Sequence, residues 1–222
     1  MPKTAAAAFA CLCLAAVSPA ARAESIPFGA SLKASGWTHQ TYLTIRAAEF
    51  SPQGDKLNIR AESAASLIWK PLPQNLNAAR KARWSWSADQ AVPPVDLTRK
   101  GGDDRVAALY FIFGEESDRS RTAIGLLRSE TVRTLVYVYG GGAPRGAVLP
   151  SPHLGARGKF VILRPANAAA GVTHAESVDL AKDFARAFGG APPPLLLGLA
   201  ISTDSDDTKS VNSAMLSVLS IE

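Results

Sequence analysis

Hydrophobic and polar residues alternate with a period of two in several short stretches, the pattern of strands that bury one face. The clearest stretch is 81–88, in which Ala82, Trp84, Trp86 and Ala88 form an apolar face opposite charged and hydroxyl side chains. Aromatic residues on the apolar face of a strand usually pack in a core. We therefore expect Trp84 and Trp86 to be core residues.

Two stretches, 105–113 and 194–202, are apolar on both faces. Such strands lie at the centre of a sheet that is covered on both sides. Shorter patterns predict further strands, separated by turn residues such as Gly54 and Gly140. These strands are expected at 42–47, 57–62, 66–72, 133–139, 159–163 and 213–221.

One segment, 178–188, has helical periodicity, because Leu180, Phe184 and Phe188 fall on one face. Ser177 is a plausible N-cap, and the glycines and prolines of 189–194 end the helix. We expect this helix to cover the outer face of a central strand. Many short strands with one late helix predict a mainly β fold, an antiparallel β-sandwich of jelly-roll, galactose-binding-like type.

The start of the chain has the features of a cleavable signal peptide over residues 1–23. Lys3 precedes an apolar run at 4–17, and Ala21-Arg22-Ala23 is a small-x-small cleavage site. The run is too short for a membrane helix, which needs roughly 20 residues. We therefore expect a single domain at 24–222, exported to the periplasm or secreted, with no membrane span in the mature chain.

Composition removes several classes of chemistry from the mature chain. Both cysteines, Cys11 and Cys13, lie inside the predicted leader, so disulfides, thiolate metal sites and cysteine nucleophiles are excluded. The net charge of +5 falls to +3 without Lys3 and Arg22, and the remaining charges are scattered. This pattern gives no basic patch for nucleic acid, which we do not expect as a partner.

Acidic residues cluster at three places: Asp103-Asp104, the segment 204–208, and 115–118. Crowded carboxylates repel one another unless they are solvated or bind a hard cation such as calcium. We predict Asp204, Asp206 and Asp207 as candidate calcium ligands; the alternative is a solvated polar turn. Paired carboxylates can also hydrolyse glycosides, which makes Asp104 and Asp206 the first substitutions for a hydrolase hypothesis.

Exposed tryptophan and tyrosine side chains can stack on sugar rings. We predict Trp37, Tyr137 and Tyr139 for this role, and Asp103 and Asp104 as binders of hydroxyl groups; Trp69 is a further prominent aromatic residue. The three histidines have no zinc-site spacing, and the chain has no G-x-S-x-G, P-loop or G-x-G-x-x-G motif. Local motifs therefore give no support for zinc, serine-hydrolase or nucleotide chemistry.

Several of these pieces occur together in a recognisable order. They are Gly36-Trp37, the W-x-W at 84–86, Asp103-Asp104 followed by Tyr110 and Phe113, Tyr137-Val138-Tyr139, Asp183-Phe184 and the D-S-D-D-T of 204–208. Together they resemble a family of bacterial exported proteins catalogued only as a domain of unknown function. The resemblance implies fold and export but no activity. The family pattern has arginines at the places of Ala108 and Val178 and favours tryptophan at Tyr139.

The function that these observations favour is a non-catalytic ligand-binding domain for a glycan or another cell-envelope component. A carboxylate-dependent hydrolase is an alternative, and acids gathered in one cleft would favour it. A structural or interaction protein of the envelope is a third reading, which the absence of any concave site would favour.

Overall fold

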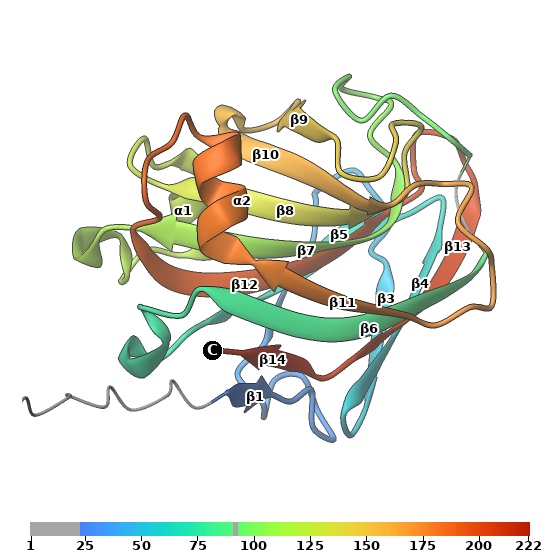
Figure 1. Cartoon of the computed structure of the whole chain (residues 1–222). Coiled ribbons are helices and arrows are strands. Elements are labelled where there is room, and N and C mark those ends of the chain that lie inside the picture. Colours follow the sequence, from blue (N-terminus) through green and yellow to red (C-terminus); the bar gives the residue numbers. More distant parts are fainter. Residues whose placement is uncertain (1–22, 91–92) are drawn as a thin grey trace, which may run out of the picture.

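The computed structural model describes residues 23–90 and 93–222, which form two seven-stranded β-sheets packed face to face (Figure 1). This arrangement confirms the mainly β sandwich of jelly-roll type. The predicted signal peptide, apart from Ala23, lies outside the described residues and stays a prediction.

The first sheet runs in the order β1-β14-β6-β13-β4-β3, with β11 paired to β6. Its strands are β1 (Glu24–Ile26), β3 (Glu49–Gln53), β4 (Lys56–Glu62), β6 (Lys81–Gln90), β11 (His174–Asp179), β13 (Val211–Ser217) and β14 (Leu219–Ile221).

The second sheet runs in the order β2-β5-β12-β7-β8-β10-β9. Its strands are β2 (Thr38–Gln40), β5 (Ala65–Pro71), β7 (Arg105–Gly114), β8 (Arg133–Tyr139), β9 (Val148–Ser151), β10 (Gly155–Arg164) and β12 (Leu195–Asp204). Among the named strands the pairing is antiparallel except between β8 and β10. That pair is parallel because β10 inserts between β8 and the edge strand β9.

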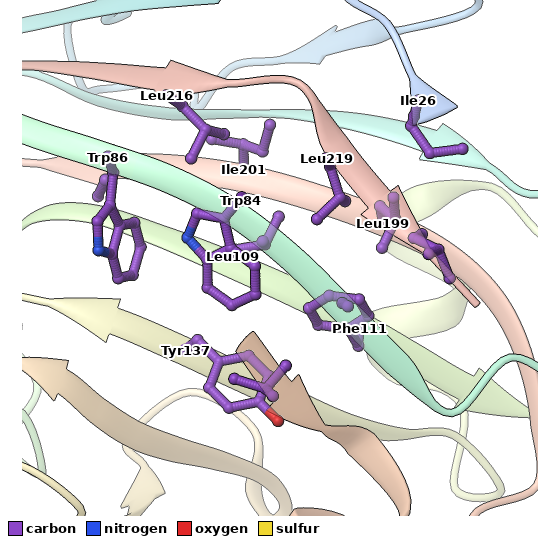
Figure 2. Packing of buried hydrophobic residues seen from close by; sticks show 14 of the residues in the cluster. Ile26, Trp84, Trp86, Leu109, Phe111, Tyr137, Leu199, Ile201, Leu216 and Leu219 are labelled. Carbon is purple, nitrogen blue, oxygen red and sulfur yellow. The ribbon is translucent and has the colours of Figure 1, made fainter. Parts of the chain in front are cut away.

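The main core fills the space between the sheets. Trp84 and Trp86 of β6 face Leu109 and Phe111 of β7 and Tyr137 of β8 (Figure 2). The ring centroids of Trp84 and Tyr137 are 5.6 Å apart. The predicted core role of both tryptophans is therefore confirmed.

A second apolar cluster lies on the outer face of the second sheet. Tyr110 and Ile112 alternate along β7 with the core residues Leu109 and Phe111, so every residue of β7 is buried. Leu97 and Leu126, which come from the connecting segments, cover this face. The prediction that 105–113 is a central strand covered on both sides is confirmed.

The predicted late helix is present as α2 (Leu180–Ala187), but it begins later and lies elsewhere than expected. Asp179, not Ser177, is its N-cap and accepts a hydrogen bond from the Lys182 N–H, because β11 continues through Asp179. Phe184 packs on Phe113 of the inner face. The outer face is covered instead by loops and by a short helix that the sequence did not predict, α1 (Ala123–Arg128). Two 3-10 turns complete the helical elements, η1 (Gln74–Leu76) and η2 (Glu116–Asp118).

The strand predicted at 42–47 is wrong, since this segment is a loop between β2 and β3. Its apolar residues Tyr42 and Ile45 line a pocket instead of joining a sheet. The strand predicted at 213–221 is divided into β13 and β14 at Val218. The remaining predicted strands occur within a few residues of their expected bounds.

Two tyrosines of β8 offer a matched test of the buried polar groups. The Tyr137 hydroxyl donates to Asp183 Oδ2 of α2 at 2.8 Å, whereas the buried Tyr139 hydroxyl has no hydrogen-bond partner among the described residues. We expect Tyr137→Phe to lower the free energy of unfolding by about 1 kcal/mol, the usual net value of such a bond, and Tyr139→Phe to lower it by less than about 0.3 kcal/mol. Urea denaturation of both variants measures the difference, and equal losses would contradict the assignment.

Candidate functional site

The outer face of the second sheet is hollow at its centre because the strand register places small residues there. Trp69 of β5 is level with Ala200 of β12, which is level with Tyr110 of β7. Gly198, two residues along, has no side chain, and the Trp69 ring lies within 3.0 Å of the place that its Cβ would occupy. Large rings therefore flank a floor of small residues.

Two loops and a helix around this floor form the walls of a pocket of about 390 Å³. The loop after β2 contributes Tyr42 and Ile45, helix α1 contributes Leu127, and the turn after β9 contributes His153 and Leu154. At one end the lining becomes polar. That end contains Gly101, Asp103, Arg105, Ser151, Asp204, Asp206 and Asp207.

Arg105 is the centre of the polar end, with a side chain only 7% exposed. Its Nη1 donates to Asp103 Oδ2 at 3.1 Å and to Asp204 Oδ2 at 3.4 Å, and its Nη2 donates to the Tyr110 hydroxyl at 3.0 Å and to Ser202 Oγ at 3.2 Å. Burial works against the charge of Arg105, but the neighbouring Tyr110, Asp204 and Asp103 outweigh it and raise its pKa. The guanidinium therefore stays charged.

The antiparallel register between β7 and β12 brings Arg105 and Asp204 together, since the two residues are direct partners at the strand ends. Asp103 lies two residues before Arg105, just ahead of β7, and also contacts His153 Nε2 at 3.2 Å. Burial alone would raise the pKa of Asp103, but the hydrogen bond from His153 and the charge of Arg105 lower it. Asp103 is thus an ionised carboxylate at neutral pH.

The pKa of Asp204 is shifted in the opposite direction from that of Asp103. Burial, together with the nearby carboxyl group of Asp206, raises the pKa of Asp204 to about 9, although Arg105 acts against the shift. At neutral pH Asp204 is therefore protonated. The polar end combines an acid and a carboxylate whose oxygens lie within about 6.5 Å of each other, because both contact Arg105 Nη1 at 3.4 and 3.1 Å.

Asp104 has a structural role beside the pocket. Its side chain is fully buried, and its carboxylate accepts hydrogen bonds from the backbone N–H groups of Asp207, at 3.3 Å, and Thr208, at 2.8 Å. These bonds fix the turn after β12, in which Lys209 has a positive φ of 54°. Asp104 therefore positions the 204–208 segment.

Two buried polar atoms in this pocket have no hydrogen-bond partner in the described part of the chain. They are the Nε donor of Arg105 and the Oδ1 atom of Asp204. A buried polar group without a partner costs free energy, so such atoms are expected to be satisfied by a ligand or by water.

The structure corrects the predicted stacking residues. Trp37 is 3% exposed, and Tyr137 and Tyr139 are fully buried in the main core, so their rings cannot contact a ligand. The Trp37 indole donates to the Pro27 carbonyl at 3.3 Å, and both tyrosines point inward because they share the face of Leu135. Trp69, an aromatic residue that was not predicted to stack on a ligand, is half-buried and lines the pocket, where a ligand can reach it.

The structure brings the two main predicted acid clusters, Asp103-Asp104 and 204–208, to one place. Oxygens of Asp104, Asp204 and Asp206 lie within 4.8 Å of one another, an arrangement that could hold a metal ion, while Asp207 is not in that group. Calcium at this position stays a prediction. The third cluster is separate, since buried Asp118 accepts from Ser129 at 2.8 Å and from Thr131 at 2.7 Å.

Sequence reasoning missed Arg105, His153 and Tyr42 as pocket residues. The family pattern has an arginine at the position of Ala108. In this chain Arg105, three residues earlier, contacts the Tyr110 hydroxyl. The position of Arg105 between two aspartates and a wholly apolar strand was the signal that could have marked it, because a charge there must be buried with a partner.

The chain belongs to a family described as "Protein of unknown function (DUF3047)", whose model matches residues 35–219. A search of curated proteins finds no significant match. The function of the family is not established by its description, which agrees with the resemblance found in the sequence.

Solved structures with a similar fold are distant in sequence. The xyloglucanase domain of NopAA, a type three effector from Sinorhizobium fredii in complex with cellobiose, has 7% identity and a TM-score of 0.43 over 84% of this chain and 90% of that one. Endoglucanase 3 of Trichoderma harzianum, from family GH12, has 9% identity and a TM-score of 0.42 over 90% of this chain and 96% of that one. The family 11 xylanase of Neocallimastix patriciarum has 9% identity and a TM-score of 0.39 over 84% and 91%. Likenesses at this level say nothing about activity.

Within the described residues, no helix combines the length and the apolar character that a membrane crossing requires.

Proposed function

We propose that this domain binds a saccharide in the pocket on the outer face of the second sheet. The observation that carries the proposal is the pair of buried atoms without partners among the described residues, Arg105 Nε and Asp204 Oδ1. A sugar hydroxyl is both a donor and an acceptor, so neighbouring hydroxyl groups of one ring can satisfy both atoms. The Trp69 ring, which flanks the pocket floor, supplies a surface for the apolar face of the sugar.

Replacement of Trp69 tests this binding mode. We expect Trp69→Ala to weaken the affinity for the bound saccharide about tenfold, because a ring that stacks on the ligand is lost. Trp69→Phe, the matched control, keeps a ring and should lose less. A glycan array with and without calcium identifies the ligand, and titration calorimetry then compares the variants. Absence of binding above background across the array would end the proposal, and equal affinities would remove Trp69 from it.

A hydrolase is the second candidate, and one observation favours it. The carboxyl groups of Asp103 and Asp204 lie in one pocket and share contacts with Arg105, at a separation compatible with an acid and a nucleophile. Product analysis during the binding experiments distinguishes the two functions. Reducing ends released by the wild type but not by Asp204→Asn would favour hydrolysis, and an unchanged saccharide would favour binding alone.

The third reading, an interaction protein without a pocket, loses support because the pocket is present. We further propose that the domain works in the periplasm or outside the cell after removal of residues 1–23. The support is the leader-like sequence. N-terminal sequencing of the exported protein should begin at Glu24, and a retained Met1 would contradict this.

A further inference from the structure

Most of the pocket wall is apolar, more than a bare sugar requires. Away from Arg105, aliphatic and aromatic side chains from four strands, two loops and α1 line the cavity. The ones that matter here are Ile45, Leu67, Ile112, Leu127, Leu154 and Phe160. A saccharide head that reaches Arg105 and Asp204 would leave this part of the pocket to be filled by apolar groups or by poorly bonded water.

Exposed apolar side chains occur in the segments that form the pocket walls. Among the described residues, the exposed large hydrophobic side chains are Tyr42, Leu43, Ile124 and Val172. Tyr42, 41% exposed, lines the pocket itself, and Leu43, 104% exposed, follows it in the same loop. Ile124, 41% exposed, is next to the lining residue Ala123 in α1. Two of the wall segments therefore carry apolar side chains in addition to those that line the cavity.

The polar end limits the charge of the head group. The charge of Arg105 is already matched by Asp103 at 3.1 Å, and Asp206 and Asp207 add further carboxyl groups to the lining. A phosphate or carboxylate head would therefore meet uncompensated acidic groups. An uncharged polyhydroxyl head meets none of this repulsion.

We infer that the natural ligand is an amphiphile, a saccharide joined to an apolar chain, with the sugar at Arg105 and Asp204 and the chain along the wall from Leu67 to Leu127. The inference rests on the proposed saccharide binding and names the class of ligand, a glycolipid or lipid-linked sugar. Tyr42, which lines the pocket and is partly exposed, gives the chain an apolar surface where the pocket meets solvent.

The test is a chain-length series. Methyl, hexyl and octyl β-glucoside are titrated calorimetrically into the protein below their micelle-forming concentrations, with octanol and octyl phosphate as further probes. Each methylene that becomes fully buried should improve affinity about fourfold. We therefore expect octyl glucoside to bind at least about a hundredfold more tightly than methyl glucoside, and octyl phosphate more weakly than octyl glucoside.

A pocket variant localises the effect. Leu127 is half-buried in the lining, and Leu127→Ser should reduce the ratio of octyl glucoside affinity to methyl glucoside affinity at least about fivefold. Val172→Ser is the matched control, because Val172 is an exposed hydrophobic residue that does not line the pocket. It should leave the whole series unchanged.

The outcomes separate this inference from the function on which it rests. Octyl glucoside that binds no better than methyl glucoside, or fails to bind at all, overturns the amphiphile, while the glycan array still decides saccharide binding. Octanol that binds as tightly as octyl glucoside shows that the sugar contributes nothing, which overturns both. A stronger affinity for octyl phosphate than for octyl glucoside contradicts the uncharged head.

Discussion

Replacing Arg105 by methionine is expected to lower the free energy of unfolding by about 3–5 kcal/mol at pH 7, the cost of breaking a buried ion pair from one side. Methionine fills much of the volume but leaves the ionised Asp103 without its cation, and the carboxyl group of Asp204 without its donor, in the buried end of the pocket. The Tyr110 hydroxyl and Ser202 Oγ lose a donor as well.

The pH dependence of this loss identifies its cause. Asp103 has a lowered pKa in the folded protein, so its ionised form contributes stability above the unfolded pKa, and this stability is lost as the pH falls through the folded value. Arg105→Met removes the part of this contribution that comes from Arg105 and keeps the part that comes from His153, so the difference from wild type should shrink as the pH falls toward about 4.

Urea denaturation at both pH values measures the effect. Arg83→Met is the control, since Arg83 is a mostly exposed arginine paired with Glu222 at 3.0 Å, and it should cost less than about 0.5 kcal/mol. A loss below about 1 kcal/mol for Arg105→Met would show that the buried pair is not what holds the pocket end together.

Asp204→Asn, unlike Arg105→Met, should raise the free energy of unfolding at alkaline pH. The pKa of Asp204 is about 9 in the folded protein, above the value of about 3.9 for an unfolded aspartate. The folded state therefore binds the proton more tightly, and wild-type stability falls as the pH rises from about 4 through 9. Asparagine resembles the protonated acid and does not titrate. The stability of the variant should therefore not fall in this way as the pH rises.

We expect Asp204→Asn to unfold at a temperature about 5 °C higher than wild type at pH 8, a gain on the order of 2 kcal/mol, with little difference at pH 4. Thermal denaturation at the two pH values checks this. Asp55→Asn, at an exposed position in the turn between β3 and β4, is the control and should stay within about 1 °C of wild type. A variant less stable than wild type at pH 8 would mean that the Asp204 carboxylate has a cation or another partner that it stabilises.

Much of the fold could be predicted because its signals are local. The two apolar faces of 105–113 follow from the covering of β7 on both sides, and the alternation of 81–88 follows from the single buried face of β6. The same periodicity shows that Tyr137 and Tyr139 share a face, but it cannot show whether that face points inward. Their wrong assignment to ligand contact came from this ambiguity.

The candidate site could be predicted only in part, because it depends on pairing between distant segments. Both acid clusters were recognised, but their meeting depends on the register that sets Arg105 opposite Asp204. The walls come from loops whose positions no periodic pattern describes, such as the segment containing Tyr42 and the turn containing His153. Trp69 was noted in the sequence, yet its accessibility depends on the glycine beside it in β12.

The first sheet pairs segments that are far apart in the sequence, since Glu24 of β1 pairs with Ile221 of β14 and β14 itself lies against β6. β13, which directly precedes β14, separates β6 from β4. β14 must therefore be synthesised before this sheet can close, and contacts of such long sequence separation form slowly. Slow closure would suit the export that we propose, because a polypeptide that has not yet folded can be threaded through a membrane.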